Sequence, residues 1–306
     1  MNKLLLILII PFLLKGQNTY EFLRVDMSPR SAALGGSFVA ANDDPNVIFN
    51  NPAGINYLKN TPVSFSFLKH LMDINFVSLS ASHNFEGIGR FGLGLKYANY
   101  GSFSERDEFG NKLSDFSVNE LAIIAGYGIK IDSNFYFGAS GKLIYSGIAS
   151  YSSTGAAIDL GFNYSIPSEE LNIGVSILNI GGQLSSYVNV SEDLPLDVVI
   201  GLSKRLANLP VKLYLDFHKI NESKESFFER LNAFTFGAEF ILSQSLMLRL
   251  GYNHEKRREL KIGNFAGLAG FNAGFGLKIS NYVFDYGFSS LGEIGSLHRI
   301  GINTEF

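Results

Sequence analysis

The stretch from Ser31 to Ile55, SAALGGSFVAANDDPNVIFNNPAGI, holds side chains whose types and spacing could do chemistry. The candidate residues are Gly35, Gly36, Asp43, Asp44, Asn50, Asn51, Pro52 and Gly54. A carboxylate that acts in acid–base or nucleophilic catalysis needs a partner group beside it. The stretch offers no His, Cys or Lys for that role. Catalysis is therefore not indicated here.

The same residues predict a local structure instead. Asp44 precedes Pro45, which is a helix-start signal because a side-chain oxygen can cap free amides while proline presets the first helical angle. Asn51 precedes Pro52, and a residue before proline is pushed out of the helical region. We expect a turn or two of helix in PNVIF and a turn in NPAG. Residues 17–61 would then form a compact polar plug.

Other chemical signals in the chain are weak. GIGRFG, Gly87–Gly92, matches a dinucleotide fingerprint but falls at a turn between two expected strands, with no helix after it. The histidines have no metal-ligand spacing; they are His70, His83, His218, His254 and His298. No acid, base and nucleophile cluster on one loop or face. The sequence predicts no metal, no cofactor and no enzyme.

Composition points away from an ordinary soluble domain. Of the 306 residues, 17% are charged and 46% are hydrophobic, whereas soluble domains carry roughly 25% charged residues. The net charge of −3 favours neither nucleic acid nor an anionic membrane surface. Cysteine is absent, which excludes disulfides and thiolate chemistry. Part of the surface is expected to face something other than water.

The first residues, MNKLLLILIIPFLLKGQ, read as a secretory signal peptide over 1–16. One lysine precedes an apolar run from Leu4 to Leu14 that is too short to span a bilayer. No apolar run of about 18 residues follows. Any membrane that the exported chain enters must therefore be entered by strands.

The rest of the chain alternates in the manner of membrane-facing strands. In NYVFDYGFS (281–289), aromatic residues occupy every second position, and small or polar residues occupy most of the others. VKLYLDFH (211–218) and LMLRLGY (246–252) show the same period. A soluble β-sandwich also alternates, so two further features decide between the folds.

The first feature is that short and long links alternate, as 131–134, 146–153, 166–170 and 179–195 illustrate. This pattern predicts an all-β, antiparallel transmembrane barrel of about 14 strands over 62–306, with short turns at one end and longer loops at the other. The link near His70 breaks the pattern because it is very short. The second feature is the terminal Phe306 on an amphipathic strand, which resembles the signal that bacterial barrel-assembly machinery recognises.

Charged residues on these strands fall on the face opposite the apolar one, so they are expected to line the lumen. They are Lys96, Lys130, Lys142, Asp159, Asp197, Lys212, Asp216, Glu239, Arg249, Lys278, Asp285, Arg299 and Glu305. Charges of both signs could line a solute pathway or neutralise one another in a plugged interior. The second interpretation is favoured, because paired charges need no substrate to explain them.

The segment HEKRREL, 254–260, reads as a solvated hairpin tip in an outer loop. Arg257, Arg258 and Glu259 are its candidates for contact with a partner protein or with an anionic sugar lipid such as lipopolysaccharide.

The segment RSAALGGSFVAANDDPNVIFNNPAGI resembles the N-terminal signature of FadL-like outer-membrane proteins, in which a similar segment folds into the barrel lumen. Four blocks in order, TYEFLRVDMSPRSAALGG, YSGIASYSSTGAAIDLG, LPLDVVIGLSKRL and FGAEFILSQSLMLRLGYNHEKRRELK, resemble the PorV/PorQ family of the type IX secretion system of Bacteroidota. Gly54 in NNPAGI follows the wider FadL-like group, and the short first outer link is another departure.

The narrower resemblance implies a 14-stranded barrel in the outer membrane of a Gram-negative, Bacteroidota-type bacterium. It implies PorV, PorU and PorZ-like partners at the cell surface, where cargo is trimmed and attached to lipopolysaccharide. The implied role is non-enzymatic: holding a PorZ-like surface protein. The alternative is a FadL-type channel for hydrophobic solutes, which needs an apolar pocket. Because the inward strand faces are charged or rich in glycine, the sequence favours the secretion component.

Overall fold

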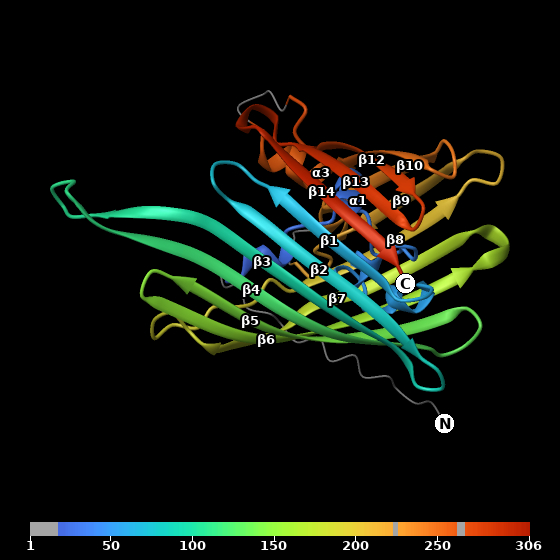
Figure 1. Ribbon diagram of the computed structural model, residues 1–306, viewed down its shortest axis with the longest axis horizontal. Coiled ribbons are helices and arrows are strands. Elements are labelled where there is room, and N and C mark those ends of the chain that lie inside the picture. Colours follow the sequence, from blue (N-terminus) through green and yellow to red (C-terminus); the bar gives the residue numbers. More distant parts are fainter. Residues whose placement is uncertain (1–17, 223–225, 262–266) are drawn as a thin grey trace.

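The computed structural model describes residues 18–222, 226–261 and 267–306. The expected signal peptide, 1–16, lies outside the described residues. Within the described ranges, fourteen antiparallel strands close into a barrel in which each strand pairs with its sequence neighbours and β1 pairs with β14 (Figure 1). The expected all-β barrel is confirmed.

The strands are β1 Pro62–Lys69, β2 Asn75–Phe85, β3 Gly89–Arg106, β4 Lys112–Lys130, β5 Phe135–Ile148, β6 Tyr151–Ile166, β7 Leu171–Ser185, β8 Asp197–Arg205, β9 Val211–Phe217, β10 Phe234–Ile241, β11 Leu246–Asn253, β12 Phe271–Ile279, β13 Tyr282–Ser290 and β14 Ser296–Glu305. The helices are η1 Glu21–Arg24, α1 Pro29–Ala33, η2 Pro45–Phe49, η3 Pro52–Tyr57, η4 Pro167–Glu169, α2 Phe227–Arg230, α3 His254–Glu259 and η5 Gly292–Ile294. In the part of the chain that the structure describes, no helix has the length and hydropathy of a membrane span.

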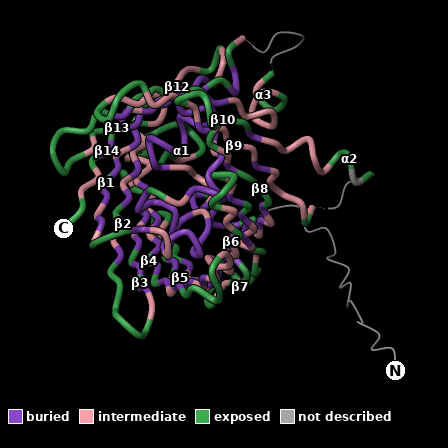
Figure 2. Tube along the Cα trace, turned by 90° about the vertical axis from the view of Figure 1, so that its right-hand side faces the viewer, coloured by how far each residue is buried: buried purple, intermediate pink, exposed green. Residues whose placement is uncertain are grey.

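Side-chain alternation decides which face of each strand turns inward. On β13, Phe284 is exposed on the outer face while Asp285 is buried inside, and the other strands follow the same plan. Figure 2 looks into the ring of strands and shows buried residues gathered within it. An apolar exterior around a polar interior is the reverse of a soluble domain and is typical of a membrane barrel.

The links divide the barrel into two ends. The turn end carries short links such as 131–134 and 280–281, and the loop end carries links such as 186–196 and 218–233. The first loop-end link, 70–74, is short, as the sequence suggested.

The expected bounds of two loop-end links are wrong, because strands extend into both. Residues 146–153 form paired strand, with Ser146 opposite Ser153 and only Ala149 and Ser150 left as the turn. β7 likewise continues to Ser185, inside the expected link 179–195. The physical reason is that backbone pairing continues in polar sequence, so strands extend past the apolar band by which they were recognised.

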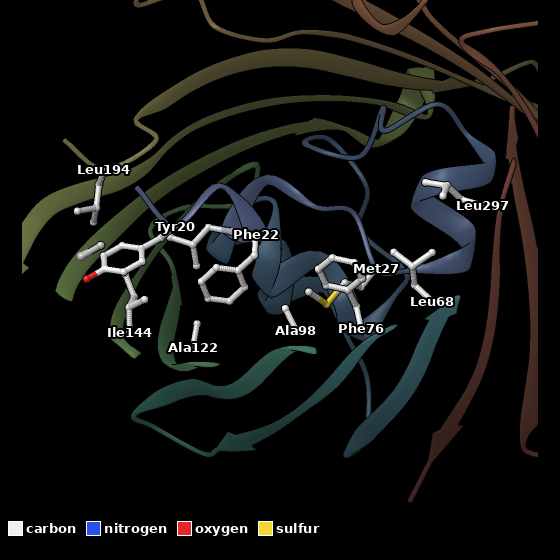
Figure 3. Close-up of a cluster of buried hydrophobic side chains, with 12 residues drawn as sticks. Tyr20, Phe22, Met27, Leu68, Phe76, Ala98, Ala122, Ile144, Leu194 and Leu297 are labelled. Carbon is white, nitrogen blue, oxygen red and sulfur yellow. The ribbon is translucent and has the colours of Figure 1, made fainter. Parts of the chain in front are cut away.

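Residues 18–61 fill much of the barrel, and we call this segment the plug. Figure 3 shows Tyr20, Phe22 and Met27 of the plug pointing toward wall residues that include Phe76 and Ile144. A second apolar cluster joins the plug side chains of Phe38, Val47, Ile48 and Ile55 to Ile124 and Tyr214 of the wall. The barrel therefore has a packed interior rather than an open pore.

Candidate functional site

The plug motif folds as two short capped helices. The side chain of Asp44 accepts a hydrogen bond from the Asn46 amide at 2.8 Å and begins η2, as the sequence indicated. Asn51 Oδ1 accepts from the Ala53 amide at 3.0 Å and begins η3. The expectation that NPAG would be a turn is therefore wrong. Asn51 followed by proline is a second helix start, equivalent to Asp44 followed by proline.

The remaining motif residues fix the path of the plug. Gly35 and Gly36 have φ of 77° and 92°, which turn the chain after α1 in a conformation that suits glycine. Asn51 Nδ2 donates to Val39 O at 2.8 Å and to Phe162 O on β6 at 3.2 Å, which ties the plug to itself and to the wall. A Cβ on Gly54 would lie 2.9 Å from Val47 Cβ, so glycine lets η2 and η3 approach closely.

Asp43 and Asp44 have different roles, because both lie near Arg30 but only Asp43 also reaches Lys212. Arg30 forms ion pairs with Asp43 at 3.0 Å and with Asp44 at 3.7 Å. Partial desolvation alone would raise the pKa of Asp43, whose side chain is 49% exposed. The positive charges of Arg30 and Lys212 outweigh that effect and hold the pKa below its usual range. Burial raises the pKa of Asp44 despite Arg30.

Arg30 also joins the plug to a charged network on the wall. Its guanidinium pairs with Glu239 at 2.9 Å, and Arg249 contacts the same carboxylate at 2.8 Å. Arg249 pairs in turn with Asp285 at 2.5 Å, and Asn303 donates to Asp285 at 2.8 Å. These charges from β10, β11 and β13 satisfy one another and one plug residue.

Two lumen carboxylates fix backbone segments inside the barrel. Asp216 accepts from the plug amides of Phe38 at 2.6 Å and Val39 at 2.8 Å. Asp159 pairs with Lys142 at 2.8 Å and accepts from a backbone amide of β7.

Two lumen cations hold the first part of the plug. Lys96 donates to the carbonyls of Leu23 at 2.9 Å and Val25 at 3.0 Å. Arg299 donates to Asp26 O at 2.8 Å and Ser289 Oγ at 2.9 Å.

The other charged residues expected on the inward strand faces lie at different depths along the barrel axis. Lys212 and Asp197 are buried in the lumen. Lys130, Lys278 and Glu305 share the inward phase but are exposed, because they lie at strand ends on the turn end of the barrel. Strand periodicity gives the face of a residue but not its depth.

A row of inward-facing glycines makes room for the plug, a role that the glycine-rich faces noted in the sequence did not reveal. Gly128, Gly138 and Gly161 lie opposite one another on β4, β5 and β6. A Cβ on Gly138 would lie 2.3 Å from Pro52 C, and one on Gly161 would lie 2.1 Å from Asn51 Oδ1. Inward-phase glycines on three neighbouring strands were the signal that could have revealed this cradle.

The opposite wall holds the plug in the same way. A Cβ on Gly251 of β11 would lie 2.2 Å from Gly35 N, and one on Gly287 of β13 would lie 2.5 Å from Pro29 O. The plug therefore touches two opposite walls with almost no clearance.

A cavity of about 620 Å³ lies between the plug and the wall, on the loop-end side of η2 and η3. Val39, Phe49 and Asn50 of the plug line it, together with residues of the loop-end links such as Leu71 and Ile294. Lys256 and Arg299 are among its cationic lining groups; its apolar lining includes Leu23, Met27, Leu71, Leu291, Ile294 and Leu297. Much of that apolar surface comes from the plug and links, which inward strand faces could not reveal.

The expected hairpin tip is helical over His254–Glu259, which form α3. Asn253 begins this helix, because its side chain accepts a hydrogen bond from the Lys256 amide at 2.9 Å. Arg257 donates to Gly267 O at 3.0 Å, Arg258 is exposed, and Glu259 lines the cavity. Asn253 is a helix cap, which the interpretation of this segment as a loop did not take into account.

Among the described residues, no group of three or more His, Cys, Asp or Glu side chains could hold a metal ion. The site is instead a packed plug beneath a cavity of mixed polarity. Its chemistry is that of binding or closure.

No protein-family model matches the chain, and no curated protein matches its sequence. Solved structures do resemble it. The toluene transporter TbuX of Ralstonia pickettii is 14% identical with a TM-score of 0.61, over 91% of this chain and 98% of that one. The toluene transporter TodX of Pseudomonas putida is 14% identical with a TM-score of 0.59, over 90% and 96%.

A FadL homologue of Pseudomonas aeruginosa is 9% identical with a TM-score of 0.59, over 92% of this chain and 98% of that one. Identities this low establish the fold alone. The chain shares the fold of FadL-like barrels, so the broader of the two expected resemblances is confirmed for the fold alone.

Proposed function

We propose that the chain is a Gram-negative outer-membrane barrel with its loop end outward, and that it binds a small, partly apolar solute as a FadL-type channel. The observation that carries this proposal is the 620 Å³ cavity between the plug and the loop end. Ligand pockets in proteins commonly measure about 300–1,000 Å³. Two barrels of the same fold are toluene transporters, which supports this class of solute.

The lining of the cavity suits a solute that has both an apolar part and a polar or anionic part. Leu23, Met27 and Ile294 offer apolar contact, while Arg299 and Lys256 add positive charge. The plug blocks continuation toward the turn end, so passage of a solute requires the plug to shift. Binding in the cavity comes before that step.

Cysteine labelling tests the orientation, with no native cysteine to give background. Asn221→Cys and Glu259→Cys, at the loop end, should react with an impermeant reagent on intact cells. Asn134→Cys, at the turn end, should not. Labelling of Asn134→Cys with protection of the other two would reverse the proposed orientation.

Calorimetry with toluene and the purified barrel in detergent tests solute binding. Asn50→Trp should abolish binding, because it fills the cavity floor. Asn134→Trp, in an exposed turn-end link, is the matched control and should bind as the parent does. Absence of toluene binding by the parent barrel would remove the support that the cavity gives to this solute class.

A second candidate is a PorQ-like component of the type IX secretion system that holds a PorZ-like surface protein beside PorU and PorV-like members. The four sequence blocks favour it, and so does the tight plug, because an anchor needs no open lumen. Deleting the gene in its own host should release the PorZ-like protein from the cell surface. Unchanged surface levels of that protein would contradict this candidate without affecting the channel proposal.

A further inference from the structure

The hairpin of β3 and β4 projects beyond the rest of the barrel at the loop end (Figure 1). The pairing of β3 with β2 ends at Asn99, and the pairing of β4 with β5 begins only at Val118. Residues 102–117 therefore form a two-stranded ribbon whose outer edges lack neighbouring strands among the described residues. At its base, the Ala149 amide donates to the Ser117 carbonyl at 3.3 Å. We call residues 102–117 the projecting hairpin.

The base of the projecting hairpin is held in a fixed direction. Tyr100 donates to Glu120 at 2.5 Å and packs its ring edge-on against Phe76 at 6.0 Å. The register shifts between Asn99 and Ser102, where Gly101 adopts a φ of 85°. This bulge bends the ribbon and sets its exit angle.

The tip is also ordered by its own side chains. Asp107 accepts from the amides of Phe109 at 2.9 Å and Asn111 at 2.8 Å. An Asx-type turn of this kind stabilises the reversal between the two strands. The projecting hairpin is thus a preformed surface feature.

Its exposed surface combines aromatic and acidic groups. The rings of Phe103 and Phe116 stack across the strands at 5.5 Å, and Leu113 is 62% exposed. The projecting hairpin carries four acidic side chains and only two basic ones. The acidic residues are Glu105, Asp107, Glu108 and Asp115, and the basic residues are Arg106 and Lys112. Exposed strand edges with apolar side chains are templates for pairing with another chain.

We propose that the projecting hairpin docks a second surface protein, which adds a basic, extended strand to its free edge and covers Phe103 and Phe116. Strand addition supplies backbone hydrogen bonds, and alternate side chains supply selectivity. The acidic excess favours a lysine- or arginine-bearing strand. It disfavours anionic lipid headgroups and a second copy of the same hairpin, since like charges would meet. The inference goes beyond solute binding but rests on the outward loop end proposed above.

The experiment places the photo-crosslinking residue benzoylphenylalanine at Leu113 of the full chain in its own host. The matched control is the same residue at Val190, which is 68% exposed in another loop-end link. Mass spectrometry should map the Leu113 adduct to an extended, basic segment of a second protein, with no such adduct from Val190. An adduct with a second copy, with lipopolysaccharide or with an acidic segment would overturn the proposal, as would no adduct.

Two variants make the test specific to the surface. The double variant Phe103→Ser, Phe116→Ser should reduce the yield of the Leu113 adduct at least tenfold. Val188→Ser, in the link between β7 and β8 that also holds Val190, should leave that yield unchanged. Equal yields from both would overturn the proposal.

External trypsin, which cleaves after Arg106 and Lys112, separates two kinds of failure. A hairpin that is cut on intact cells but forms no adduct overturns docking alone. A hairpin protected in cells that lack every other surface protein overturns the outward placement as well.

Discussion

Replacing Gly138 by valine should unseat the plug, because the new side chain would occupy the space of η3. Its Cβ would stand 2.3 Å from Pro52 C, whereas nonbonded carbons prefer about 3.5–4 Å. Either η3 moves by more than about 1 Å or β5 bends. Overpacking of this kind costs about 1–3 kcal/mol. Movement of η3 also strains the 2.8 Å bond from Asn51 to Val39.

The matched control is Gly141→Val on the same strand, where an added Cβ meets nothing within 4 Å. Heat-modifiability on gels measures unfolding of the barrel, and swelling of proteoliposomes in sugar solutions measures permeability. Given the unfolding entropy per residue of globular proteins, a loss of 1–3 kcal/mol corresponds to a fall in Tm of about 1.5–5 °C for a chain of this size. Gly138→Val should show that fall and faster swelling, while Gly141→Val should match the parent.

The steric argument would be refuted if both valine variants kept the parent Tm and swelling rate. Swelling that rises equally in both would instead point to a general loosening of β5. Only a difference between the two positions supports closure by the plug.

The remaining predictions concern assembly, pH and capping. Deleting Phe306 should lower the yield of folded, heat-modifiable barrel without changing export across the inner membrane, and an unchanged yield would make that residue incidental. Burial alone would lower the pKa of His218, but the Asp197 carboxylate, 3.7 Å from its Nδ1, raises that pKa overall. The stabilisation from this ion pair is therefore full below the unfolded pKa of about 6.5 and is lost as pH rises through the folded pKa. Tm should therefore fall over that range in the parent and less in His218→Gln, and parallel curves would contradict this. Replacing Asp44 and Asn51 together by alanine removes both helix caps, at about 1 kcal/mol each, and should increase antibiotic uptake; parent-like uptake and Tm would refute the capping role.

Much of the fold was predictable because membrane strands carry a clear period of two. The aromatic face of β13 and the terminal strand could be read directly from the sequence. Polar stretches were the weak point, since residues 146–153 pair as strand without an apolar stripe. Whether a polar segment pairs depends on the neighbouring strand, which local sequence does not reveal.

The site was less predictable because its contacts join distant parts of the chain. Asp44 and Asn51 were recognisable as helix starts from the following proline. Arg30 was not singled out, although it meets Glu239 across 209 residues of sequence. The apolar lining of the cavity was missed for the same reason, because plug and loop side chains come together only in the closed barrel.

The central claim is that the plug closes the lumen and leaves the cavity open toward the loop end. The most direct measurement compares Asn50→Cys, on the cavity side of the plug, with Asn56→Cys, whose side chain bonds Phe137 near the turn end. On intact cells, an impermeant thiol reagent should label Asn50→Cys and leave Asn56→Cys unreacted. Equal labelling of both positions, or labelling of Asn56→Cys alone, would contradict the claim.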